Sequence, residues 1–107
     1  MKKNKKNNKS KIRKDFRLEL RKNREASITE LKDGIREAND MAMLVDGHDN
    51  ALVGWSTDGI AIYRISEIIG TLIDRDGMSR EEAMEYFDFN ILGAYVGEYT
   101  PIYMYEE

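Results

Sequence analysis

Basic residues are concentrated near the N-terminal end of the chain, which leaves the remainder to form a folded core. Residues 1–24 hold 12 of the 17 Lys and Arg residues. The stretch 1–11, MKKNKKNNKSK, is almost free of apolar side chains, so it cannot bury enough surface to offset the entropy of ordering. We therefore expect a basic arm over residues 1–26 and a single acidic domain over residues 27–107.

The arm and the domain carry opposite charges. Residues 1–24 contain 12 basic and 2 acidic side chains, whereas the remaining 83 residues contain 5 basic and 18 acidic ones. A polycation gains affinity for nucleic acid by releasing condensed counterions, so we predict that the arm contacts nucleic acid or a nucleoprotein. Ile12, Phe16 and Leu20 recur every four residues, so the arm is expected to be disordered alone or helical on binding. A solubilising tail, or a clamp onto the acidic body or another copy, are the alternatives. The predicted nucleic-acid-binding residues are Lys2, Lys3, Lys5, Lys6, Lys9, Lys11, Arg13, Lys14, Arg17, Arg21, Lys22 and Arg24.

The residue inventory argues against catalysis. The chain has no cysteine and a single histidine, His48, which excludes disulfides, thiolate catalysis and cysteine-based zinc sites. It contains no phosphate-binding glycine loop and no nucleophilic serine motif. We therefore predict a non-catalytic protein without a metal or a cofactor. No apolar run approaches the roughly 18–20 residues of a membrane span, and no secretory signal pattern follows the basic start, so the expected location is the cytoplasm.

Hydrophobic periodicity predicts an α+β fold for the domain. Ile28, Leu31 and Ile35 form a helical stripe. Three short apolar runs follow, separated by connectors rich in Asp, Asn and Gly, which favour turns. The predicted elements are a helix over 27–40, strands over 41–45, 51–55 and 60–65, helices over 65–77 and 79–97, and a strand over 101–105. We expect a small antiparallel sheet, a three-stranded meander plus the C-terminal strand, packed by two or three helices.

The predicted helix over 79–97 has one apolar face and one acidic face. Ser79 and Glu82 have the spacing of a capping box, and Gly97 is expected to end the helix. Its predicted apolar face consists of Ala83, Met84, Phe87, Ile91, Leu92 and Tyr95. A row of carboxylates on the outer face can imitate nucleic-acid phosphates or meet a basic partner. The predicted partner-binding residues are Glu81, Glu82, Glu85 and Asp88, with the aromatic residues Trp55 and Tyr63, for which a core role is the alternative.

Two loops resemble ion-binding sites in composition. If Gly77 took the sixth position of a calcium loop, Asp74 and Asp76 would take the third and fifth. Positions 1 and 12 would then lack ligands, so we interpret this stretch as a helix end. The loop 46–50, DGHDN, contains His48 and two aspartates. It is interpreted as a turn, with a metal site or an acid–base site as the alternative.

The C-terminal part also contains a specific pattern of short motifs. The segments are Asp76–Met78, Glu81–Ala83, Glu85–Phe87, Phe89–Asn90, Gly93–Glu98 and Thr100–Pro101. This pattern resembles a family of small uncharacterised proteins from tailed bacteriophages and bacteria, and the resemblance covers roughly residues 46–102. It implies a phage-type accessory protein in the host cytoplasm and brings no catalytic residue.

The function expected from the charges and the resemblance is binding rather than chemistry. We predict an accessory protein that occupies a host nucleic-acid-handling protein or nucleoprotein complex, as an inhibitor or in an anti-defence role, while its arm contacts nucleic acid. One alternative is an oligomeric sponge that binds a small ligand or nucleotide through its Tyr and Trp residues. The other alternative is a small enzyme that uses the His48 loop.

Overall fold

The computed structural model describes residues 27–106. Contacts divide the chain into two units, Met1–Glu30 and Leu31–Glu107, and the fold described below is that of the second unit. The arm and its predicted nucleic-acid-binding residues lie outside the described residues. The first described element is a helix over residues 27–38, which agrees with the helix predicted there.

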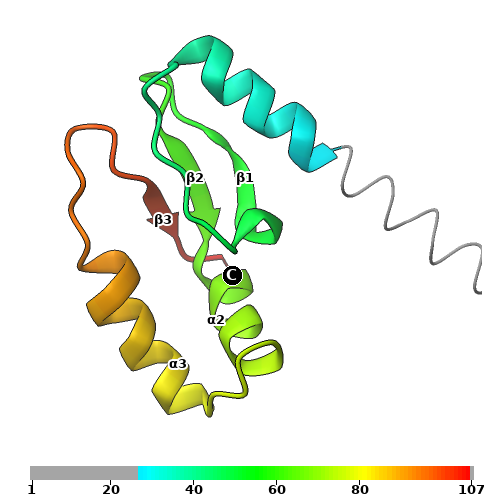
Figure 1. Ribbon diagram of the computed structural model, residues 1–107, viewed down its shortest axis with the longest axis vertical. Helices are drawn as coiled ribbons and strands as arrows, with labels where there is room; N and C mark the ends of the chain where they lie inside the picture. The colour runs from blue at the N-terminus through cyan, green and yellow to red at the C-terminus, as the bar shows by residue number, and fades with distance from the viewer. Residues whose placement is uncertain (1–26, 107) are drawn as a thin grey trace, which may run out of the picture. The chain divides into compact units, whose positions relative to one another are not determined.

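The described part of the chain has an α+β fold with three helices and a three-stranded mixed sheet (Figure 1). The sheet has the order β1-β2-β3, with β1 antiparallel to β2 and β2 parallel to β3. A short 3-10 turn precedes the first strand, and a π-helical segment extends the last helix. The elements that follow the helix over 27–38 are η1 (Asp49–Ala51), β1 (Leu52–Trp55), β2 (Ala61–Arg64), α2 (Ile65–Asp74), α3 (Arg80–Tyr86), η2 (Phe87–Leu92) and β3 (Ile102–Met104).

The hairpin between β1 and β2 is formed as the sequence predicted. Ser56 fixes its turn, because its Oγ accepts hydrogen bonds from the amides of Asp58 and Ile60 at 3.3 and 3.2 Å. Gly59 has a φ of 74°, a left-handed conformation that favours glycine. Helix α2 begins at Ile65, the residue that follows the end of β2, so no loop connects the strand and the helix.

The prediction of a strand over residues 41–45 is wrong, because this segment pairs with none of the strands in the described region. The amide of Met41 donates to the side chain of Asn39 at 3.1 Å, and the amide of Val45 donates to the Tyr63 hydroxyl at 2.8 Å. Ala42 and Leu44 nevertheless pack against the core. The apolar run is therefore partly buried, as a strand would be, but its amides bind side chains and the carbonyl of Asn39 instead of a strand neighbour.

The prediction of an all-antiparallel sheet is also wrong. Strand β3 lies parallel to β2, with Ile62 opposite Ile102 and Arg64 opposite Met104. The chain leaves β2, passes through α2, α3 and η2, and returns over residues 93–101 to run in the same direction as β2. A crossover that contains helices permits this parallel pairing, which a tight hairpin cannot.

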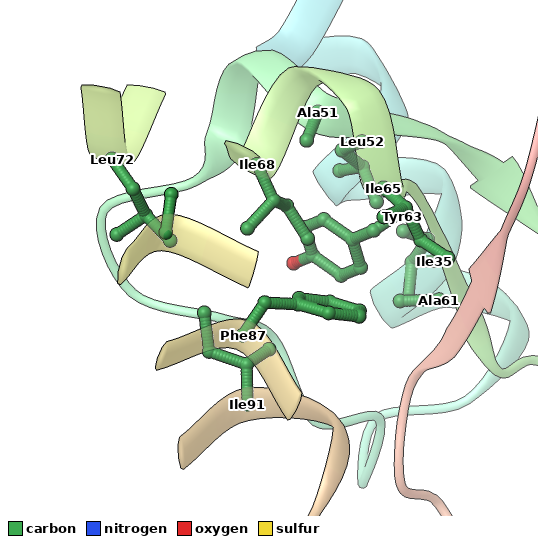
Figure 2. Packing of buried hydrophobic residues seen from close by; sticks show 11 residues of the cluster. Ile35, Ala51, Leu52, Ala61, Tyr63, Ile65, Ile68, Leu72, Phe87 and Ile91 are labelled. Carbon is green, nitrogen blue, oxygen red and sulfur yellow. The ribbon is translucent and has the colours of Figure 1, made fainter. Parts of the chain in front are cut away.

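The core lies where the helices meet the sheet, and Tyr63 and Phe87 lie within it (Figure 2). Tyr63 has no exposed surface, and burial raises the pKa of its hydroxyl to about 12. The ring of Phe87 packs edge-to-face on Tyr103 of β3, with ring centroids 5.5 Å apart. This contact fixes the α3–η2 segment at the β3 side of the sheet, since β2 separates β3 from β1.

Local interactions end α2 and begin α3 in the short connection between the two helices. Gly77 has a φ of 70°, and its amide donates to the carbonyl of Ile73 at 3.1 Å. Ser79 caps α3 as predicted, since its Oγ accepts from the amide of Glu82 at 3.1 Å and its amide donates to the Glu82 carboxylate at 3.4 Å. Asp76 binds the guanidinium of Arg75 through both carboxylate oxygens. The calcium-like stretch is therefore a helix end followed by a capped helix.

Candidate protein-binding surface on helix α3

The candidate binding surface lies on α3 and on the π-helical segment that continues it. Ala83, Phe87 and Ile91 are buried at intervals of four residues. In an α-helix, with 3.6 residues per turn, side chains at that spacing drift around the axis. The hydrogen bonds of a π-helix join residues five apart and widen the turn, so Phe87 and Ile91 both continue to face the core (Figure 2).

The helix ends earlier than the sequence predicted. Gly93 follows the last π-helical residue, and its amide donates to the carbonyl of Asp88 at 3.0 Å. Met84 and Leu92 are each 50% exposed and Tyr95 is 79% exposed. The prediction that these three residues belong to the buried face is therefore wrong, and that face consists of Ala83, Phe87 and Ile91. Gly97, predicted to end this helix, lies in the loop that follows. A β-carbon at Gly93 would lie 2.9 Å from the carbonyl oxygen of Asp88, so the tight end of the π segment requires glycine.

The acidic face predicted on this helix is present and exposed. Glu81, Glu82, Glu85 and Asp88 all point to solvent. Within the described residues, Glu81, Glu85 and Asp88 form neither a salt bridge nor a side-chain hydrogen bond. Glu82 is held only by the capping box. These carboxylates therefore carry negative charge that no neighbouring cation neutralises in the described structure.

Apolar side chains that sequence reasoning assigned to no site are interleaved with the carboxylates. Phe89 is 80% exposed, Met84 and Leu92 are each 50% exposed, and Tyr86 is 41% exposed. The sequence did contain a signal for Phe89. If Phe87 and Ile91 face the core, the residue midway between them must face away. We call the exposed set Glu81, Glu82, Met84, Glu85, Tyr86, Asp88, Phe89 and Leu92 the α3 surface.

Two hollows flank the α3 surface. One is shallow, with a volume of about 330 Å³, and lies over Met78, Glu82, Glu85, Tyr86, Phe89 and Asn90. The other is a groove of about 310 Å³ between α2 and α3, with Ile69 and Ile73 on one side and Met84 and Phe87 on the other. The C-terminal segment borders this groove, where Glu106 accepts from Ser66 at 2.9 Å. Both hollows combine apolar side chains with carboxylates.

The two aromatic residues predicted to contact a partner do not lie on the α3 surface. Tyr63 is fully buried, so it has to be removed from the partner-binding set, and the alternative core role is correct for it. Trp55 is 41% exposed, but it lies on β1, at the edge of the sheet opposite β3. Its indole covers Gly34 so closely that a β-carbon there would lie 2.6 Å from the ring, which explains a glycine inside that helix.

The His48 loop is built into the fold rather than open to a substrate. His48 is only 4% exposed, and its Nδ1 has no hydrogen-bond partner among residues 27–106. Burial, followed by the positive charge of Arg75, lowers its pKa below the usual 6.5. Asp49 pairs with Lys32, and Asn50 binds Thr71 at 3.0 Å. Residues 27–106 contain no group of three or more His, Asp or Glu side chains placed to hold a metal ion.

Comparisons with family models, with curated proteins and with solved structures found no match to this chain. Among the described residues, no helix is both long enough and apolar enough to cross a membrane.

Proposed function

We propose that this chain is a non-catalytic binding protein whose α3 surface docks on a basic surface of a nucleic-acid-handling protein. The observation that carries the proposal is the mixture of exposed Phe89, Met84 and Tyr86 with carboxylates that lack partners. Aromatic residues and Met are enriched at protein interfaces, and contiguous exposed apolar patches mark interaction sites. The carboxylates favour a positively charged partner surface and disfavour a negatively charged one.

Proteins that handle nucleic acid present basic surfaces, because they must neutralise phosphates. The α3 surface offers such a protein several carboxylates on one short helix, in place of the phosphates. The phage-type resemblance supports the same proposal, because an accessory protein of this size acts by occupying a host component. In this proposal the basic arm holds nucleic acid near the docked domain, in the host cytoplasm.

The two alternatives have less support. A sponge for small ligands would need aromatic side chains that converge, yet Tyr86 lines the shallow hollow on one flank of α3 and Tyr105 lines the groove on the other. An enzyme that used His48 would need its imidazole to meet a substrate, and that side chain is buried. Neither alternative has an observation that favours it over docking.

A pull-down from host lysate with the full-length chain tests the docking surface. The test variant, with Glu81→Lys and Glu85→Lys, reverses two charges on α3. The control variant, with Asp33→Lys and Glu37→Lys, reverses two exposed charges on the helix over residues 27–38. We expect nuclease-resistant capture of a specific protein by the wild type and by the second variant, and loss of that protein with the first. Equal capture by both variants would refute docking through α3.

The role of the arm needs its own experiment. Deletion of residues 1–24 should abolish a salt-dependent gel shift of RNA or DNA, because it removes 12 of the 17 basic residues. A shift that survives the deletion would remove the arm from the proposal and leave docking through α3 untouched.

A further inference from the structure

We infer that the shallow hollow over Glu82, Glu85, Tyr86 and Phe89 receives an arginine side chain of the basic partner. This inference rests on the proposed function and adds the chemical group that is recognised. Met78 and Asn90 complete the lining, and no basic side chain takes part in it. We call these six residues the α3 cradle.

The spacing of the cradle residues brings two kinds of chemistry to one place. Glu82, Glu85, Tyr86 and Phe89 follow each other at steps of three, one and three residues, which places them on one face of the helix. Phe89 lies on the first turn of the π-helical segment, and four-fifths of its surface faces solvent. The hollow therefore has aromatic walls next to carboxylates.

The carboxylates of the cradle are open to a new partner. Glu85 forms no salt bridge or hydrogen bond in the described region, and Glu82 uses one oxygen to accept from the Ser79 amide at 3.4 Å. Arg80, the only basic residue of α3, lines the groove on the other flank of the helix and not the cradle. A cation that enters the cradle would thus meet two carboxylates and no competing positive charge.

Arginine suits these walls better than other groups do. Its guanidinium is planar, stacks on an aromatic face and donates a fork of hydrogen bonds to a carboxylate. The lysine ammonium is a compact, strongly hydrated charge that does not stack. An apolar side chain would strip water from Glu85 without offering a donor in return. A metal ion would require more oxygen ligands than the cradle supplies.

The test compares labelled peptides for binding to the full-length chain by fluorescence anisotropy. The probes are a peptide of alternating Arg and Gly, the same peptide with Lys at each Arg, and the same peptide with neutral citrulline. We expect the Arg peptide to bind several-fold more tightly than the Lys peptide, and the citrulline peptide not to bind. Equal binding of the Arg and Lys peptides would reduce the effect to net charge and overturn the inference, as would no binding of the Arg peptide.

Variants locate the binding on the cradle. Phe89→Ala should weaken binding of the Arg peptide by about twofold to thirtyfold, the range expected for a lost cation–π contact. Glu85→Gln should weaken it by about twofold to fivefold, as expected for a lost exposed ion pair. Tyr95→Ala removes an equally exposed aromatic side chain, and Glu98→Gln removes an exposed charge, both outside the cradle. Neither control should change the affinity, and weakening by the controls as strong as by the cradle variants would overturn the inference.

The outcome separates this inference from the proposed function. If the lysate partner is lost on reversing Glu81 and Glu85 but the Arg and Lys peptides bind equally, docking stands and arginine recognition fails. If arginine is preferred but no protein depends on the α3 charges, the cradle stands and the proposed docking of a host protein fails.

Discussion

Two phenylalanines two residues apart provide the sharpest test of the surface described here. Phe87 is 2% exposed and packs on Tyr103, whereas Phe89 is 80% exposed. Replacing each with Ala removes the same atoms from the same helical segment. We expect Phe87→Ala to damage the fold and Phe89→Ala to damage only partner binding.

The expected magnitudes follow from burial. Full burial of a Phe side chain contributes about 1.5–3 kcal/mol, and an edge-to-face ring pair adds about 0.5–1.5 kcal/mol. With a cavity that relaxes only in part, Phe87→Ala should cost about 3–5 kcal/mol. A domain of about 80 residues has a total stability of roughly 4–12 kcal/mol, so this variant loses much of it. Phe89→Ala should change the free energy of unfolding by less than about 0.5 kcal/mol.

Urea unfolding, followed through the fluorescence of Trp55, measures both variants. With a slope of roughly 1 kcal/mol per molar urea, the midpoint should fall by about 3–5 M for Phe87→Ala and hardly move for Phe89→Ala. If Phe87→Ala does not fold in water, Phe87→Leu keeps most of the apolar volume and should cost roughly 1 kcal/mol. Equal shifts for Phe87→Ala and Phe89→Ala, or a large loss with Phe89→Ala, would refute the assignment of one ring to the core and the other to solvent.

Four further predictions concern the fold that supports the surface. Ser79→Ala removes the capping box of α3 and should cost about 0.5–2 kcal/mol in the same urea assay; an unchanged midpoint would contradict the role of the cap. Gly93→Ala would place a β-carbon 2.9 Å from a backbone oxygen of the preceding turn, so it should destabilise by about 1–3 kcal/mol and speed amide exchange over residues 88–93. A β-carbon added at Gly70 would meet no atom of another part of the described structure within 4 Å. Gly70→Ala should therefore leave the free energy of unfolding unchanged or raise it by up to about 1 kcal/mol. Because the pKa of His48 is lowered in the folded state, the unfolded chain binds its proton first, so stability should be retained above pH 6.5 and decrease as the pH falls below that value. The urea midpoint should show this slope between about pH 5 and 7 and lose it in His48→Gln, and an identical slope in that variant would assign the effect elsewhere.

The sequence predicted the elements that carry their own end signals. The capping residue Ser79, the left-handed Gly77 and the turn at Gly59 each act within a few residues, so their effect can be worked out without knowing the fold. The segment over 41–45 shows where such reasoning stops. Its short run of apolar residues predicted a strand, but whether a strand pairs depends on a neighbour that is distant in the sequence. Here the hydroxyl of Tyr63 takes the place of that neighbour.

The direction of β3 and the π-helical segment could not be predicted for the same reason. Strand β3 spans only three residues, Ile102–Met104, and so short a strand carries no signal for parallel or antiparallel pairing. The π-helical turn over Phe87–Leu92 keeps Phe87 and Ile91 buried, but residues four apart share a face in an ordinary α-helix as well, so their spacing gives no signal for the wider turn. The acidic half of the candidate site was predicted, since carboxylates at helical spacing are visible in the sequence. The aromatic half was missed, although the assignment of Phe87 and Ile91 to the core side already places Phe89 on the opposite side of the helix.

The fold itself gives no reason for the exposed ring of Phe89. The buried side of the same segment is complete, since Ala83, Phe87 and Ile91 pack into the core, and a polar residue at position 89 would cost the fold almost nothing. A single exposed apolar residue is ordinary, but Phe89 lies with Tyr86 in a hollow that also contains Glu82 and Glu85. Exposure of these rings to water is unfavourable. A group that covers the rings and also donates hydrogen bonds to the carboxylates removes that exposure without leaving a buried charge unpaired. A cationic planar side chain is a common protein group that does both, which is the reason for proposing partner binding and arginine recognition for this helix.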